Sequence, residues 1–142
     1  MISAVIAVGV LVLVVALVIA VARDPGPPAD DVAVAYEEAW DRLDFEALWA
    51  LSGDELRDGM GRHDFVAAKR GAYRRQPDLG RLASSVVVEH VDAGKHAAVV
   101  RTRVDVRDGG VARNEVVLEH RAGRWLVVAY HLVGSDQPHS SP

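Results

Sequence analysis

Three histidines are candidates for chemistry in this sequence. His90, His120 and His131 fall on one face of a predicted antiparallel sheet, and the first two share a row across it. Imidazole titrates near neutral pH and ligates metals, so this pair could orient a ligand, hold a transferable proton or supply part of a metal site. No third ligand is assigned to the row, so no metal site is predicted. The alternative is that the histidines lie at the open rim of the sheet, bonded to water or backbone.

Two tyrosines on predicted helices point towards the same face of the sheet. Tyr36 and Tyr73 would line the space between helices and sheet, beside Trp40. Aromatic walls with a few polar groups are typical of a small-molecule site, although core packing is the alternative use of such side chains. The predicted pocket residues, for a small apolar ligand, are Tyr36, Tyr73, His90, His120 and His131.

An enzyme of isomerase type would need a carboxylate base that faces this pocket, with an acid donor opposite. Four acidic residues of the first three predicted strands fall on the outer face: Glu89, Asp105, Glu115 and Glu119. Thr102 and Asn114 are the inward polar residues, besides histidine, of the two middle strands. We therefore predict a non-catalytic ligand-binding or protein-interaction module with no catalytic residue and no cofactor. An isomerase- or dehydratase-type enzyme remains the alternative.

The histidines are positioned by four predicted strands. β-Branched residues, alternating hydrophobicity and Gly-centred breaks indicate an antiparallel meander. The strands are Ser84–Val91, Ala97–Arg107, Val111–Arg121 and Arg124–Leu132. Along each strand, alternate residues are apolar, and these form the face of the sheet that packs on the core. The charged residues between them form the outer face.

Turn lengths then predict the register. A three-residue loop after the second strand would pair Arg103 with Glu115. A two-residue loop at Ala122-Gly123 would pair His120 with Trp125, and Trp125 would be largely buried. The predicted inner face comprises Val86, Val88, His90, Ala98, Val100, Val104, Val116, Leu118, His120, Trp125, Val127, Ala129 and His131. The charged outer face is either solvated or the surface of a homodimer.

Three predicted helices cover the inner face. The first is capped by Asp30 or Asp31 and the second, Phe45–Leu51, by Asp44. The third runs from about Asp64 to Arg75. The predicted polar face of the first helix comprises Glu37, Glu38, Asp41 and Arg42.

The N-terminal run Ile2–Ala22 contains no charged residue. About 20 apolar residues of helix cross a bilayer core, and a cleaved signal peptide would have a basic start and a shorter apolar run. We predict a retained single-pass anchor, with cleavage after Ala22 as the alternative. Arg23 favours a cytoplasmic domain, whereas the acidic, Pro-rich flank and the possible cleavage site favour export. We predict a bacterial cell membrane protein with an extracytoplasmic domain, and the cytoplasmic orientation is the alternative. The predicted divisions are an anchor (1–22), a linker (23–29), a domain (30–133) and a disordered tail (134–142).

Composition excludes several classes of function. The 142 residues include no Cys, which rules out disulfides and thiolate chemistry. The formal net charge of -4 gives no electrostatic case for nucleic-acid binding. The abundance of Arg, Ala and Val is typical of a GC-rich bacterial genome.

Three stretches resemble the NTF2-like superfamily, and one of them, Leu51–Leu56, is similar to the loop after its second helix. Ala35–Leu48 is similar to its opening helix, break and second helix, and Gly123–Val127 is similar to its closing strand. The resemblance covers about Asp30–Leu132. With the anchor, the chain resembles small bacterial membrane-anchored members, among them DUF4878-like and Mce-associated proteins, without the Cys of their lipoprotein versions.

The resemblance implies an α+β fold: a transmembrane helix, then a cone of three helices packed on a four-stranded antiparallel meander sheet. It also implies a pocket inside the cone and, in many members, a homodimer through the sheet. Superfamily members include isomerases, dehydratases, transport factors and domains without known activity, so the resemblance does not choose between the two functions.

Overall fold

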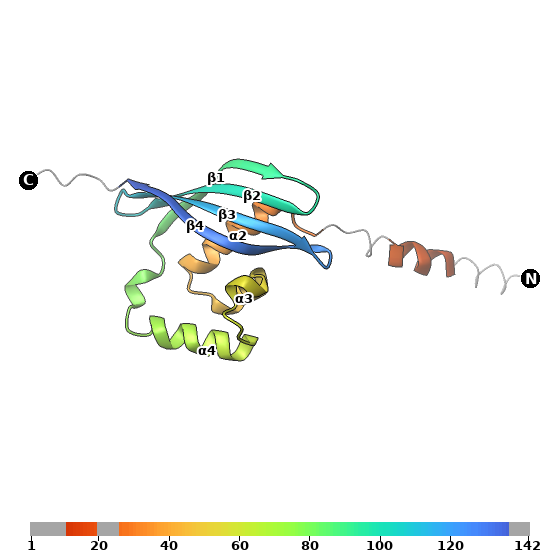
Figure 1. The fold of residues 1–142 in the computed structure, drawn as a ribbon, viewed down its shortest axis with the longest axis horizontal. Coiled ribbons are helices and arrows are strands. Elements are labelled where there is room, and N and C mark those ends of the chain that lie inside the picture. The colour runs from red at the N-terminus through yellow and green to blue at the C-terminus, as the bar shows by residue number, and fades with distance from the viewer. Residues whose placement is uncertain (1–10, 20–25, 137–142) are drawn as a thin grey trace, which may run out of the picture.

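The computed structural model describes residues 11–19 and 26–136. The helices of the domain are α2 (Ala29–Asp41), α3 (Phe45–Leu51) and α4 (Arg62–Tyr73), with short 3-10 turns η1 (Asp54–Leu56) and η2 (Pro77–Leu79). The strands are β1 (Ala83–Ala93), β2 (Ala97–Val106), β3 (Val111–Arg121) and β4 (Arg124–Asp136). Figure 1 shows a helical layer beneath one curved sheet, with α2 lying against it.

The sheet has the order β1-β2-β3-β4, and each neighbouring pair is antiparallel. The predicted α+β architecture, with three helices and a four-stranded meander, is therefore confirmed for the described domain. Segments close in sequence form each hairpin, so the topology needs only short connections.

The predicted register between β2 and β3 is wrong by two residues. Glu115 lies opposite Arg101, with 3.3 Å between Arg101 Nε and Glu115 Oε2, and Arg103 lies opposite Arg113. The turn is longer than predicted, because the last pair joins Asp105 to Val111. A slip of two residues leaves every side chain on its predicted face, since strand side chains alternate with a period of two.

A β-bulge in β4 exchanges the faces of the residues that follow it. The predicted pairs His120–Trp125 and Leu118–Val127 are confirmed, but Val117 then pairs with Ala129 and Val116 with Tyr130. A bulge adds one unpaired residue and reverses the alternation beyond it. The inward placement of Ala129 and His131 was therefore wrong, and Tyr130 takes the inner face.

A bulge in β1 has the same effect on His90. Val88 pairs with Thr102, whereas His90 pairs with Arg101, whose side chain is on the outer face. The predicted inward orientation of His90 was wrong for this reason. His90 and His131 are both exposed.

A side chain caps the start of α3, whereas α2 and α4 have no side-chain cap. Asp44 caps α3 as predicted, because its Oδ1 accepts a hydrogen bond of 3.0 Å from Ala47 N. α2 instead follows Pro28, which leaves Asp30 and Asp31 in the first turn, where acidic side chains favour the helix dipole. α4 lies two residues N-terminal to its predicted range, and β4 continues past residue 133 to Asp136.

The core lies between α2, α3 and the centre of the sheet. Its least exposed side chains are Ala33, Ala39, Leu48, Val100, Val116, Leu118 and Val127. The alanines of α2 lack bulk, so they let the helix backbone approach the strands closely. Trp125 packs against this core and is half-buried rather than largely buried.

The predicted span Ile2–Ala22 lies mostly outside the described residues. Its described part, 11–19, is helical, and each of its residues is exposed. Within the described ranges, no helix is long and apolar enough to cross a membrane. The last part of the predicted tail, 137–142, also lies outside the described residues.

A matched pair of leucine substitutions tests the assignment of the core. Leu118 is 0% exposed and Leu132 is 64% exposed. We expect Leu118→Ala to lower the free energy of unfolding by about 2–5 kcal/mol, because it opens a buried cavity. Leu132→Ala should change it by less than about 0.5 kcal/mol. Urea unfolding measures both, and equal losses would contradict the assignment.

Candidate functional site

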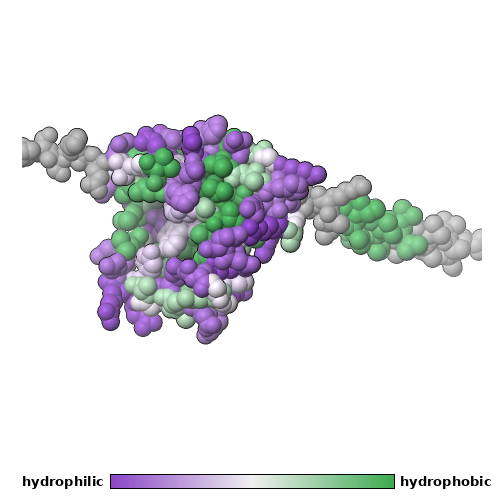
Figure 2. All heavy atoms as spheres, viewed as in Figure 1, coloured by the Kyte–Doolittle hydropathy of each residue, from purple (hydrophilic) through white to green (hydrophobic). Residues whose placement is uncertain are grey.

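A pocket of about 330 Å³ lies between the helices and the sheet. Its lining is mainly apolar, with three aromatic side chains and three polar residues. The aliphatic members are Leu43, Leu79, Leu82, Ala83, Val104, Val106 and Ala112; the others are Trp40, Tyr73, Tyr130, Glu37, Asp41 and Asn114. Figure 2 shows hydrophobic residues exposed between the hydrophilic upper edge of the domain and the lower helices. We refer to this cavity as the main pocket.

Glu37 is a buried carboxylate in the wall of the main pocket, with 5% of its surface exposed. Its Oε1 accepts hydrogen bonds from Thr102 Oγ1 at 2.6 Å and from Asn114 Nδ2 at 3.0 Å. Its Oε2 accepts one from the Tyr130 hydroxyl at 2.7 Å. One side chain of α2 is thus bonded to three neighbouring strands, β2, β3 and β4.

The sequence prediction had placed Glu37 on the solvent face of its helix, and this was wrong. For the same reason, the prediction that the pocket lacks an inward-facing carboxylate was also wrong. Ala29, Ala33 and Glu37 are four residues apart, so they share a row along α2, and all three are buried. In the sequence, this spacing and the predicted inward side chains of Thr102 and Asn114 were the signals that Glu37 is buried. In the structure Thr102 and Asn114 are 0% and 6% exposed.

The hydrogen bonds to Glu37 come from neutral groups. No ion pair involves Glu37 among the residues that the structure describes. Three donors replace the water that a carboxylate loses on burial. The pKa of Tyr130 is raised, first by burial and then by the charge and hydrogen bond of Glu37, so this phenol keeps its proton and donates it to the bond.

A second cavity of about 240 Å³ lies among α2, α3, η1 and α4. Trp40 and Tyr130 line both cavities, so these two rings form a shared wall. Tyr36 lines the second cavity, and burial raises its pKa. The remaining lining residues are Leu48, Ser52, Glu55, Leu56, Asp58, Phe65 and Lys69.

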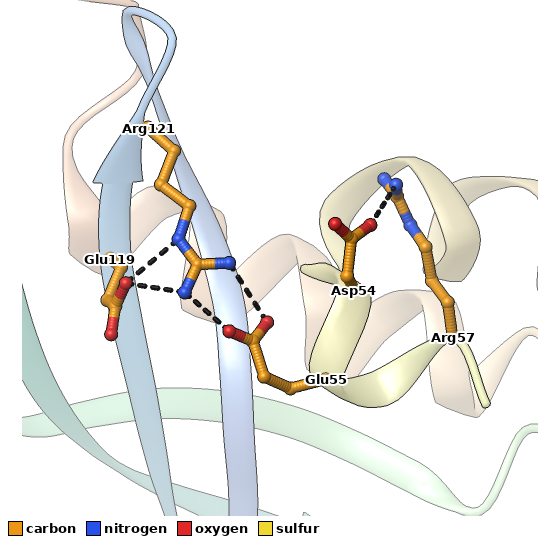
Figure 3. A network of polar contacts seen from close by, with 5 residues as sticks. All are labelled: Asp54, Glu55, Arg57, Glu119 and Arg121. Atoms are coloured by element: carbon orange, nitrogen blue, oxygen red, sulfur yellow. Dashed lines mark hydrogen bonds and ion pairs between the residues drawn. The ribbon is translucent and has the colours of Figure 1, made fainter. Parts of the chain in front are cut away.

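Ion pairs connect η1, which forms one wall of the second cavity, to the sheet (Figure 3). Arg121 Nη1 donates to Glu55 Oε2 at 3.0 Å, and Arg121 Nε donates to Glu119 Oε2 at 2.8 Å. The pKa of Glu55 is lowered, mainly by this hydrogen bond from Arg121. Gly53 N also donates to Val127 O at 2.7 Å. A Cβ on Gly53 would lie 2.5 Å from Glu55 Oε2, so a larger residue would disturb this junction.

The structure separates the five predicted pocket residues. Tyr73 lines the main pocket and Tyr36 lines the second cavity. His120 packs edge-to-face on Trp125, with 5.1 Å between ring centroids. None of the three histidines lines either cavity, because the bulges turn His90 and His131 outward. Across the described ranges, no group of three or more His, Cys, Asp or Glu could hold a metal ion.

Solved structures of other proteins identify the fold. No family model and no curated protein matches the chain. A putative NTF2-like transpeptidase from Campylobacter jejuni is similar in structure: 16% identity, TM-score 0.51, covering 71% of this chain and 97% of that one. An NTF-2 like protein of unknown function from Shewanella oneidensis is similar at 23% identity and TM-score 0.52, covering 72% of this chain and 93% of that one. The chain therefore has an NTF2-like fold, as the resemblance implied.

The bond between Tyr130 and Glu37 predicts how stability depends on alkaline pH. The raised pKa means that folded Tyr130 keeps its proton above pH 10, where an unfolded tyrosine loses it. The folded state then binds more protons than the unfolded state, so stability falls as the pH rises above about 10. We expect Tyr130→Phe to make this fall shallower. Urea unfolding at a series of alkaline pH values measures it, and an unchanged slope would contradict the assignment.

Proposed function

We propose that this NTF2-like domain is a non-catalytic ligand-binding module, held at a bacterial membrane by Ile2–Ala22. It takes a small apolar molecule into the main pocket. The observation that supports this proposal most is the lining, which combines aliphatic and aromatic walls with few polar groups in a volume of about 330 Å³. Pockets for small molecules in proteins have this composition, and their volumes start at about 300 Å³.

The polar groups of the main pocket support binding more than catalysis. Glu37 already accepts three hydrogen bonds within the protein, and its partners come from three strands. A general base must reach the proton that it removes and must reorganise little as it does so. A carboxylate fixed by three donors is better suited to orienting a ligand than to exchanging protons with it.

A small isomerase- or dehydratase-type enzyme remains a second candidate, and one observation favours it. Glu37 lines the main pocket, and the hydroxyl of Tyr130 beside it is a hydrogen-bond donor. A carboxylate and a proton donor in one cavity are the groups that such a reaction needs. The inward carboxylate that the predicted strands lack is thus supplied by the first helix of the domain.

The membrane part of the proposal is supported by the N-terminal sequence. Ile2–Ala22 has 21 residues without charge, enough for a helix across a bilayer core of about 30 Å. The described helical stretch, 11–19, exposes apolar side chains all round, and Figure 2 shows it as uniformly hydrophobic. A helix that is apolar on every side is suited to lipid rather than to water.

Matched phenylalanine substitutions test the pocket. Ala112 lines the main pocket, whereas Ala129 pairs with Val117 on the outer face of the sheet. We expect Ala112→Phe to fill the pocket and lower the affinity for n-octanol, used as an apolar probe, by about tenfold or more. Ala129→Phe should leave it unchanged. Isothermal calorimetry measures both; no binding by the parent, or equal binding by the two variants, would refute the proposal.

Membrane attachment is tested by fractionation of bacterial cells that express the full chain. We expect the full chain in the membrane fraction, resistant to high salt, because apolar burial rather than charge would hold it there. A variant that lacks residues 2–22 should be released into the soluble fraction. Recovery of a soluble protein whose N-terminus is Arg23 would show cleavage and overturn the retained anchor.

A further inference from the structure

The charged residues that line the main pocket are all acidic. Glu37 and Asp41 line it, and no Lys, Arg or His does so among the residues that the structure describes. The two carboxylates are one turn apart on α2, where like charges repel. Asp41 is fixed at the edge of β1, because its Oδ1 accepts a hydrogen bond of 2.8 Å from Ala83 N. The wall that α2 contributes is therefore negatively charged.

The hydrogen bonds of Glu37 leave room for one more donor. An ionised carboxylate offers about four acceptor positions, two on each oxygen. Thr102 and Asn114 occupy Oε1, whereas Oε2 accepts from Tyr130 alone among the described residues. The three partners are neutral, so they satisfy hydrogen bonds without supplying a counter-charge. A buried carboxylate is most stable with an opposite charge beside it.

The remaining walls suit a cation as well as an apolar body. The rings of Trp40, Tyr73 and Tyr130 line the pocket, and an ammonium group is attracted to the face of such rings. Trp40 and Tyr73 lie with ring centroids 6.0 Å apart. Leu79 and Leu82, which are 46% and 45% exposed, add an apolar rim.

We infer that the ligand of the main pocket is an organic amine: a positively charged nitrogen on an apolar body. The ammonium group binds beside Glu37 and the aromatic rings, and the apolar part lies along the aliphatic walls. This inference rests on the proposed ligand-binding function and names the chemical class of its ligand. An anionic ligand would be repelled by Glu37 and Asp41, and a neutral one would leave their charge uncompensated.

Three eight-carbon probes test the inference on the full chain: n-octylamine, n-octanol and octanoate. Their chains are alike and their head groups are positive, neutral and negative at pH 7. We expect octylamine to bind at least about tenfold more tightly than octanol, and octanoate to bind most weakly. Isothermal calorimetry measures all three. In Glu37→Gln, the preference for octylamine over octanol should fall to about threefold or less.

Glu38→Gln is the matched control. Glu38 is the next residue of α2, is exposed, and does not line the main pocket. This variant should keep the preference of the parent for octylamine. Equal loss in both variants would show a long-range effect of net charge and overturn the role given to Glu37.

The outcomes separate the inference from the function on which it rests. If octanol binds the parent as tightly as octylamine, the amine class is wrong while the pocket still binds apolar molecules. If none of the three probes binds, the proposed function falls as well. A second measurement needs no variant: nuclear Overhauser contacts should join the α-methylene protons of octylamine to the Tyr130 ring. Contacts from the terminal methyl group instead would place the ammonium elsewhere and overturn the inference.

Discussion

The buried carboxylate of Glu37 is the interaction on which the rest of the domain depends. It connects the helical layer to three strands, through Thr102, Asn114 and Tyr130. Loss of one partner of a buried hydrogen bond leaves the other unsatisfied, at a cost of about 1–3 kcal/mol. Thr102 and Asn114 are cross-strand neighbours, so the carboxylate also favours one register of β2 against β3. Packing alone would tolerate a slip of two residues more readily, because the apolar face would be preserved.

The bulge in β4 determines which side chain completes this network. Without the extra residue between the Val127 and Ala129 pairs, Tyr130 would face outward and His131 would face the helices. A donor from β4 would then be missing at Glu37, and the wall shared by the two cavities would lose its phenol ring. Bulges are frequent beside functional sites because they redirect a side chain without breaking the sheet. Here one inserted residue exchanges an imidazole for a phenol in the interior.

The fold is compatible with many functions, so the function is inferred from the residues that line the pocket. Similar structures at 16% and 23% identity share the architecture with this chain and show no more than that. In folds that host many activities, function follows from the chemistry of the site. In this domain the main pocket combines a buried carboxylate, three aromatic rings and aliphatic walls. Among the described residues, no basic side chain lines this pocket. That combination favours a ligand with complementary charge and an apolar body.

The sequence by itself determined the elements, their order and most of their faces. Periodicity placed α3 and its Asp44 cap and the four strands of the meander, because these signals are local and alternation allows only one face to be apolar. The two-residue turn after Arg121 also determined the pair of His120 and Trp125. Only the tertiary structure decided the register of β2, because a slip of two residues preserves the faces that the sequence predicts. It alone decided the bulges, because nothing in the local pattern marks the extra residue that reverses the alternation beyond it. It alone decided the burial of Glu37, whose partners are 65, 77 and 93 residues away in the chain. A glutamate on a helix is expected in water, and it is stable in the interior only where distant donors meet it.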